Sequence, residues 1–164
     1  GTATLKVDDN IWNYLPKVDR TIKVPASMMS GAWMGSHFSN DDLVKENRMS
    51  KQYTGEFVSK PGEAGDNYVI ALTPNPDAPV VWGKVVVEIT PDKLPVKIEY
   101  YDEKDRLKRT MTFTDYRDMD GRQVPGRMRM EPTDKPGEYT EMVYSELRFV
   151  DVPESRFSLK ALKQ

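Results

Sequence analysis

The sequence of 164 residues predicts a mainly β protein built around an antiparallel sheet. Short runs in which apolar and polar residues alternate recur along the chain, and Pro, Gly, Asp and Asn cluster in the breaks between them. In the run 84–89, for example, Val85, Val87 and Ile89 share one face, which is the period of a half-buried strand. Segments with helical periodicity are scarce, so helices are expected to play a minor part.

The first elements are expected to form a three-stranded meander. Residues 2–7 and 11–15 lie on either side of 8–10, an Asp-Asp-Asn tripeptide that favours a tight hairpin turn. The Pro-Lys dipeptide at 16–17 then turns the chain into a third strand over 18–24. Neighbouring strands joined by such short turns pair with each other, so these three should be consecutive in a sheet.

One short helix is predicted over residues 40–47. Ser39 stands at the expected N-cap position, and Asp41 and Asp42 fall in the first turn, where acidic groups complement the helix dipole. The rest of the chain returns to strands and turns. Asp120-Gly121 is the dipeptide most typical of a type I′ hairpin turn, and residues 153–162 are expected to end the chain with a short helical turn. The remaining predicted strands are 53–59, 67–73, 84–89, 96–101, 107–119, 123–132 and 139–149.

Composition narrows the functional classes. The formal net charge of −2 gives no cationic field for phosphate, so nucleic acid is not an expected partner. The chain has no cysteine, which excludes disulfides, zinc-thiolate sites and thiol nucleophiles. It has neither a transmembrane-length apolar run nor a signal peptide, so a signal peptide of an exported protein would lie outside this chain. No linker or repeat divides residues 1–164, and a single domain is the expected organisation.

Catalytic and metal-binding motifs are not evident. His37 is the single histidine, and no orienting acid or oxyanion hole accompanies it, so a structural or loop-surface role is favoured over catalysis. Asp41-Asp42 and the acidic turn 102–105 lack the alternate oxygen spacing of a calcium loop. No glycine-rich run follows a strand to hold a nucleotide. We therefore expect no enzyme activity, no cofactor and no metal.

The hairpin 106–129 is locally basic. Its cationic residues are expected to form a solvated sheet face, although they would also suit docking of an acidic partner or anionic lipid headgroups. They are Arg106, Lys108, Arg109, Arg117, Arg122, Arg127 and Arg129.

Residues 27–38 do not match a core strand. The segment is rich in Met, Gly, Ser and aromatic residues and keeps no period of 2 or 3.6. Gly31 and Gly35 permit unusual backbone geometry, and flexible thioethers repack around ligands of differing shape. A long loop that fills an ordinary core explains this composition, and so does a ligand-binding segment. The candidate ligand-binding residues are Met28, Met29, Trp33, Met34 and Phe38, with Trp12 and Tyr14 from the first hairpin.

The same region carries a family resemblance. The ordered motifs are Ile-Trp-Asn-Tyr-Leu-Pro at 11–16, Val-Asp-Arg at 18–20, and the stretch from Ser27 to Leu43, which includes Met-Gly-Ser at 34–36 and Asp-Asp-Leu at 41–43. Together they resemble the LolA-like family of outer-membrane lipoprotein-sorting proteins across essentially the whole chain. The resemblance implies a strongly curved antiparallel sheet, an incomplete β-barrel, with a loop or short helix plugging its concave face. It also implies that the family's N-terminal helix and first strands are missing from this chain.

The function implied by the resemblance is binding and not catalysis. Members of this class are exported and shelter the acyl chains of lipoproteins in an apolar cavity, so the expected location is the periplasm. The implied partners are a lipid or lipoprotein acyl chain, an inner-membrane exporter and an outer-membrane acceptor. A sister group with the same fold acts as a sensor, and the alternative function is therefore a periplasmic sensor or adaptor that binds a protein such as an exporter or an anti-sigma regulator. A hydrolytic role is the least favoured.

Overall fold

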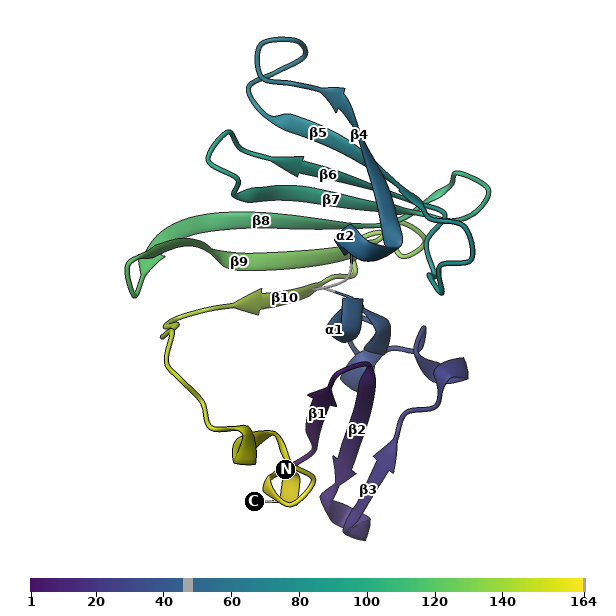
Figure 1. The fold of residues 1–164 in the computed structure, drawn as a ribbon, viewed down its shortest axis with the longest axis vertical. Coiled ribbons are helices and arrows are strands. Elements are labelled where there is room, and N and C mark those ends of the chain that lie inside the picture. The colour runs from purple at the N-terminus through teal and green to yellow at the C-terminus, as the bar shows by residue number, and fades with distance from the viewer. Residues whose placement is uncertain (46–48, 164) are drawn as a thin grey trace. The chain divides into compact units, whose positions relative to one another are not determined.

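The computed structural model describes residues 1–45 and 49–163, which form two compact units. The terminal unit combines the start of the chain, up to residue 45, with residues 150–163, and the sheet unit holds residues 49–149. Figure 1 shows the elements of both units along the chain. Each unit is described by itself below, and the single-domain organisation of 1–164 stays a prediction.

The terminal unit contains the expected meander. Strands β1 (Ala3–Val7), β2 (Asn10–Leu15) and β3 (Arg20–Lys23) pair antiparallel in the order β1-β2-β3. Asp8 takes the positive φ of 51° that the tight turn between β1 and β2 requires, and Ile11 is fully buried. The turn after β2 is the 3₁₀ helix η1 (Pro16–Val18), in which proline at the first position fixes φ. The three-stranded prediction is confirmed.

Irregular backbone follows, as the sequence predicts. It includes the 3₁₀ turns η2 (Ala26–Met28) and η3 (Trp33–Gly35), and then helix α1 (Asn40–Lys45). The Asp42 amide donates to Ser39 Oγ at 3.3 Å and the Ser39 amide donates to Asp42 Oδ2 at 2.7 Å, a reciprocal capping arrangement. The N-cap prediction is confirmed, while the expected helical residues 46–47 lie outside the described residues.

The C-terminal segment belongs to the terminal unit. It forms the 3₁₀ helices η4 (Glu154–Phe157) and η5 (Ala161–Lys163), which both contact β1. Lys163 Nζ lies 3.0 Å from Asp19 Oδ1, and the hydrogen bond from this ammonium group lowers the pKa of the Asp19 carboxyl. The expected short helical ending is therefore present as two turns.

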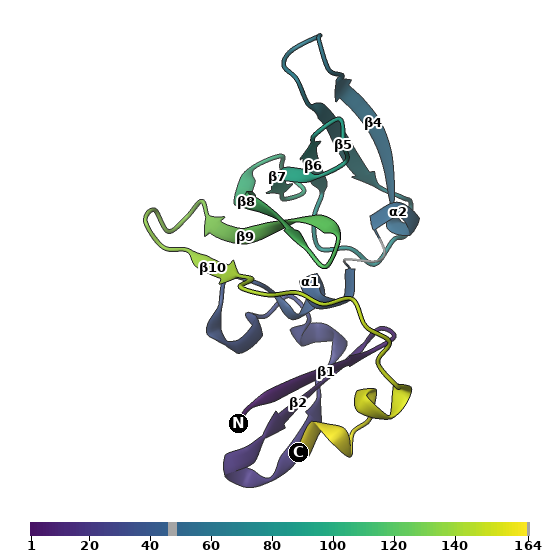
Figure 2. The same cartoon turned by 90° about the vertical axis from the view of Figure 1, so that its left-hand side faces the viewer.

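The sheet unit is a single antiparallel meander. After helix α2 (Met49–Gln52), which the sequence analysis did not predict, seven strands follow in the spatial order β10-β9-β8-β7-β6-β5-β4. The strands β4 and β10 are the two edges, so the sheet is open and not closed into a barrel, and it twists between them (Figures 1 and 2). The mainly β fold class is confirmed. The strands are β4 (Tyr53–Ser59), β5 (Tyr68–Pro74), β6 (Lys84–Ile89), β7 (Pro95–Tyr101), β8 (Leu107–Met119), β9 (Arg122–Pro132) and β10 (Thr140–Val143).

Local turn chemistry sets the register of the two longest strands. Asp120 and Gly121 join β8 to β9 with φ values of 54° and 75°, the left-handed pair of a type I′ turn. Asp115 also has a positive φ, of 58°, within β8. Gly126 on β9 fits closely there, since a Cβ on it would lie 2.7 Å from the Asp115 carbonyl oxygen.

The last strand is shorter than predicted. The alternation predicts a strand over 139–149, whereas β10 ends at Val143. Tyr144 N still donates to the Gly126 carbonyl at 2.8 Å, and the pairing with β9 ends there. Phe149 N donates instead to Asp120 Oδ2 at 2.7 Å, so the end of this segment is held by the turn between β8 and β9. Among the described residues no helix is long and apolar enough to cross a membrane.

Candidate functional site

The register of the sheet gathers its large apolar side chains on one face. Cross-strand partners in an antiparallel sheet point to the same side, and each chain of partners therefore defines a row across the strands. The longest row runs from Phe57 on β4 to Thr140 on β10, and its last apolar residue is Met130 on β9. We call this side the apolar face. Its apolar members are Phe57, Tyr68, Ile70, Leu72, Val85, Val87, Ile89, Ile98, Tyr100, Met111, Phe113, Met128, Met130 and Met142.

The apolar face is only partly covered. Val85 and Met130 are fully buried, but most members of the face, Ile98 and Met111 among them, are half-buried, and Phe57 is 58% exposed. Five strand intervals separate Phe57 from Met130, the apolar ends of the longest row, a span of about 24 Å at the usual strand spacing. A contiguous, partly exposed apolar surface on a folded protein is typical of an interaction site for an apolar partner.

The opposite face is polar and internally paired. Lys97 Nζ lies 3.6 Å from Glu99 Oε1 and 3.9 Å from Glu88 Oε2, so one lysine bridges two acids from neighbouring positions. Arg129 pairs with Glu131 at 3.0 Å, and Arg127 pairs with Glu141. Exposed pairs of this kind are worth little stability but leave little net charge. The prediction of a solvated sheet face is confirmed for these two arginines.

Arg109 corrects that prediction, because it lies on the apolar face and is only 6% exposed. The register that pairs Ile98 with Met111 also places Arg109 opposite Tyr100, and it shifts only beyond that pair. Its guanidinium carbon lies 4.3 Å from the Tyr100 ring centroid and 4.6 Å from that of Trp82, a spacing typical of cation–π contacts. Tyr53 is buried nearby and its hydroxyl donates to the Trp82 carbonyl at 3.4 Å.

The predicted ligand-binding residues all lie in the terminal unit. Trp12 and Tyr14 are half-buried and, two residues apart on β2, share one face of the three-stranded sheet. Trp33 Nε1 donates to Thr4 Oγ1 at 3.0 Å, on the other face, where Thr4 pairs with Asn13. The structure therefore places Trp33 on the opposite side of this sheet from Trp12 and Tyr14.

The segment 27–38 closes on itself. Trp33 N donates to the Phe38 carbonyl at 2.7 Å, and Phe38 is buried. Met29 is half-buried, whereas Met28 and Met34 are exposed. A ligand-binding role for these residues stays a proposal, because nothing in the terminal unit by itself brings all seven together.

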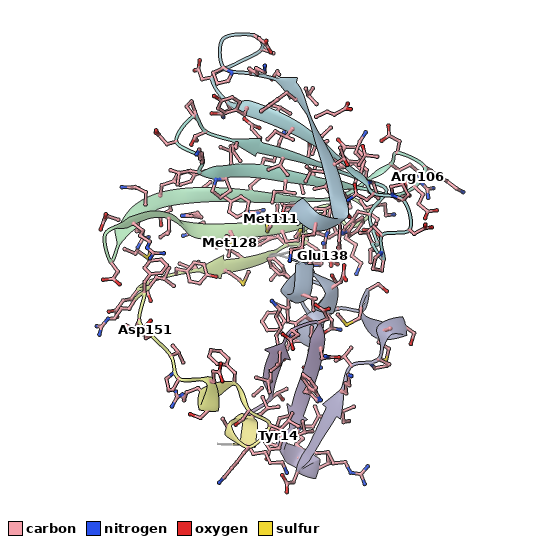
Figure 3. All side chains as sticks on the ribbon, viewed as in Figure 1. Tyr14, Arg106, Met111, Met128, Glu138 and Asp151 are labelled. Atoms are coloured by element: carbon pink, nitrogen blue, oxygen red, sulfur yellow. The ribbon has the colours of Figure 1, made fainter. Side chains whose placement is uncertain are left out.

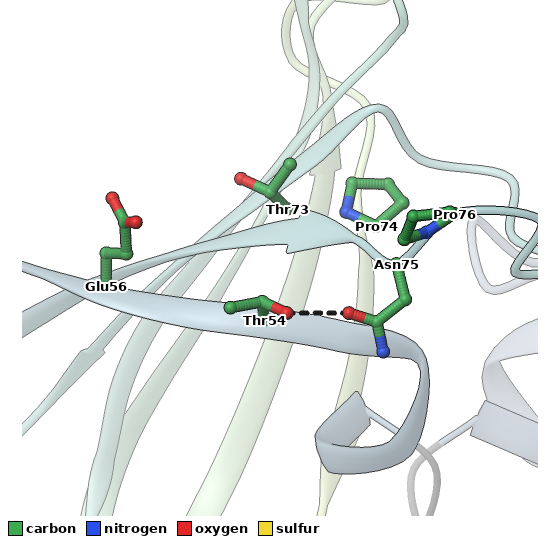
Figure 4. Close-up of a pocket in the computed structure, with 6 residues that line it drawn as sticks. All are labelled: Thr54, Glu56, Thr73, Pro74, Asn75 and Pro76. Atoms are coloured by element: carbon green, nitrogen blue, oxygen red, sulfur yellow. Dashed lines mark hydrogen bonds between the residues drawn. The ribbon is translucent and has the colours of Figure 1, made fainter.

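A small depression lies at one end of β4 and β5 (Figure 4). It has a volume of about 310 Å³ and is lined by Thr54, Glu56, Thr73, Pro74, Asn75 and Pro76. Thr54 Oγ1 donates to Asn75 Oδ1 at 2.6 Å, and Thr54 and Glu56 belong to the polar side of the sheet. Two prolines contribute to its lining, but the polar groups of Thr54, Glu56, Thr73 and Asn75 do not suit an acyl chain.

Groups for catalysis are sparse in the described part of the chain. No cluster of three or more His, Cys, Asp or Glu residues suited to a metal occurs among residues 1–45 and 49–163. His37 is half-buried within the irregular segment. The most extensive feature of the described residues is apolar area.

Comparison with solved structures defines the class. The chain is similar to a domain from Vibrio parahaemolyticus that bears the name outer membrane lipoprotein-sorting protein (28% identity, TM-score 0.79), covering 97% of this chain and 68% of that one. It is also similar to a DUF1329 family protein from Desulfovibrio piger (27% identity, TM-score 0.84), with a match that covers 96% of this chain and 66% of that one. A LolA superfamily protein from Nitrosomonas europaea is similar as well (23% identity, TM-score 0.76), with a match that covers 98% of this chain and 71% of that one. The chain thus spans about two thirds of the length of each.

These matches confirm a LolA-like, lipoprotein-sorting type of fold. A family model whose description is "Uncharacterized protein" matches residues 1–164, and the chain belongs to that family. The comparison with curated proteins gave no significant match.

The apolar face was missing from the sequence-predicted site residues. The alternation of strands 84–89 and 107–119 indicated an apolar side for each, but a row such as Val87, Ile98 and Met111 depends on pairing between strands. The sequence did contain one indication of this face: Leu107, Met111 and Phe113 are separated by even numbers of residues within one predicted strand.

Proposed function

We propose that this protein is a non-enzymatic carrier that shelters lipoprotein acyl chains, or another lipid, on the apolar face of its seven-stranded sheet. The observation that carries the proposal is the partly exposed apolar row from Phe57 to Met130, backed by a polar face on the other side of the same strands. The similarity to a domain named for lipoprotein sorting supports it. Burial of each methylene contributes about 0.8 kcal/mol, so a chain of many carbons binds without any covalent step.

The proposed setting is the periplasm, between an inner-membrane exporter that delivers the lipid and an outer-membrane acceptor that takes it. Handover needs only a difference in buried apolar area between donor and acceptor. We further propose that the seven residues of the terminal unit named from the sequence contribute to ligand binding. These residues are Trp12, Tyr14, Met28, Met29, Trp33, Met34 and Phe38.

Two neighbouring residues of β7 provide the test. Ile98 lies on the apolar face between Val87 and Met111, while Lys97 lies on the polar face. Ile98→Ser removes apolar contact worth about 1.5–2 kcal/mol and should weaken binding of a fluorescent long-chain fatty acid roughly 10- to 30-fold. Lys97→Ser, the matched control, should leave affinity nearly unchanged. Equal affinities for the two variants, both folded cooperatively, would place the ligand elsewhere.

A second candidate function is a sensor or adaptor that binds a protein partner. The observation that favours it is edge strand β4, which pairs only with β5 among the described strands and exposes Phe57 and Val58. An exposed strand edge is a template on which an extended segment of another protein can pair. If the adaptor function holds, substitutions on β4 should abolish a protein interaction while fatty-acid binding by the apolar face is undetectable.

A further inference from the structure

Methionine is distributed unevenly over the sheet. Strands β4, β5, β6 and β7 contain no methionine, although the chain has nine. Strands β8, β9 and β10 contain Met111, Met119, Met128, Met130 and Met142. The apolar face therefore differs in side-chain type from one edge of the sheet to the other.

Four of these methionines are cross-strand neighbours on the apolar face. Met111 is opposite Met130, and Met128 is opposite both Phe113 on β8 and Met142 on β10. Figure 3 labels Met111 and Met128 on the adjacent strands β8 and β9. Met130 is fully buried, while the other three are half-buried and offer thioether surface to a ligand. We call Met111, Met128, Met130 and Met142 the methionine half of the face.

The other half is built mainly from branched side chains, with the aromatic residues Phe57, Tyr68 and Tyr100 beside them. Ile70, Val87 and Ile98 form its central row, with Leu72 and Val85 alongside. Valine and isoleucine carry two heavy atoms on Cβ and are restricted to few rotamers, so this half presents a fixed shape. Methionine is unbranched, with three rotatable bonds, and it repacks around partners of different outline.

We propose that the apolar face accepts kinked, cis-unsaturated acyl chains as well as straight ones, and that the methionine half supplies this tolerance. The inference rests on the proposed function and specifies its ligand class. A straight chain fits the fixed rows of β5 to β7, whereas a cis double bond displaces the chain sideways. The displaced part needs a wall that adapts without leaving voids or clashes, and only the methionine half offers one.

The test compares oleic and stearic acids, which have the same chain length, in competition with a fluorescent fatty acid. The variant M111I/M128I/M142I replaces the three half-buried methionines with stiff side chains of similar size and leaves Met130 in place. The matched control is I70L/I98L on the branched half, which keeps volume constant. Both variants are first checked for a cooperative thermal transition.

The wild type is expected to bind the two acids within about threefold of each other. In the methionine variant the affinity for oleic acid should fall about tenfold relative to that for stearic acid, because the kinked chain then meets rigid side chains. The control should keep the wild-type ratio of the two affinities. An unchanged ratio, an equal loss of both acids, or the same shift in the control overturns the inference while fatty-acid binding remains. A wild type that binds neither acid rejects the proposed function itself.

Discussion

Gly83 is the residue at which a single methyl group should disturb the sheet most. It immediately precedes β6, and its amide donates to the Tyr101 carbonyl at 3.0 Å. A Cβ at this position would lie 2.6 Å from the Asp102 carbonyl oxygen and 2.7 Å from Glu103 Cα. Both are backbone atoms of the turn between β7 and β8, so no side-chain rotation relieves the overlap. Gly83→Ala must push β6 away from that turn.

The expected cost follows from these distances. Overpacking against backbone costs about 1–3 kcal/mol, and a weakened hydrogen bond to Tyr101 adds about 1 kcal/mol. Replacing glycine also lowers the conformational entropy of the unfolded chain, which offsets about 0.4–1 kcal/mol of this loss. The net loss of unfolding free energy should be about 1–3.5 kcal/mol. Trp82, next to Gly83, should also shift relative to Arg109 and Tyr100, which changes its near-ultraviolet signal.

Urea unfolding followed by circular dichroism measures this loss. Gly55→Ala on β4 is the control, since its Cβ would meet only side-chain methyl groups and no backbone atom, with Leu72 Cδ2 at 3.1 Å and Ile70 Cγ2 at 3.3 Å. It should cost less than about 1 kcal/mol. If Gly83→Ala costs under about 0.5 kcal/mol, or no more than Gly55→Ala, the close approach of β6 to the β7–β8 turn is wrong.

Three further perturbations have defined outcomes. Hydrogen bonds from the Arg106 backbone amide, and then from the Arg106 side chain, lower the pKa of Asp102 from 3.8 to about 2. The stability that the charged Asp102 contributes is therefore complete above the unfolded pKa and disappears as the pH falls from about 4 to 2. The Tm difference between wild type and Asp102→Asn should shrink over that pH range, and a constant difference would contradict the role of Asp102. Ser39→Ala should lower the free energy of unfolding by about 1 kcal/mol and speed hydrogen exchange in α1. Unchanged exchange would show that Ser39 does not cap this helix. Replacing His37 with Ala should leave fatty-acid affinity within a few-fold, while Ser at both Trp33 and Met34 should weaken it by several kcal/mol in calorimetric titrations; the reverse pattern would point to a reactive site.

Local chemistry made much of the fold predictable. Asp120-Gly121 specifies its turn through two residues that tolerate positive φ, so the longest hairpin follows from the sequence alone. The strand 107–119 has the predicted bounds. Consecutive hairpins pair with their neighbours, and the strand order of the sheet follows from that rule.

Non-local contacts were not predictable in the same way. Arg109 stands in a run of basic residues, which favours solvent, yet it has the parity of Met111 and Phe113 and lies on their face. Its stabilising partners include Trp82, more than twenty residues away in sequence. Trp33 likewise pairs with Thr4 from the first strand, and nothing in the local pattern of residues 27–38 indicates that partner. Both placements depend on tertiary pairing that overrides local preference.

The most direct test of the central claim is to locate a bound acyl chain by photocrosslinking. A fatty acid with a diazirine near the end of its chain is equilibrated with the purified protein, irradiated, and its adducts are assigned by peptide mass spectrometry. The account predicts adducts on the apolar face, at residues such as Val87, Ile98 and Met111, that an excess of unlabelled fatty acid suppresses. Suppressible adducts confined to the polar face, or labelling that excess ligand does not compete away, would contradict it.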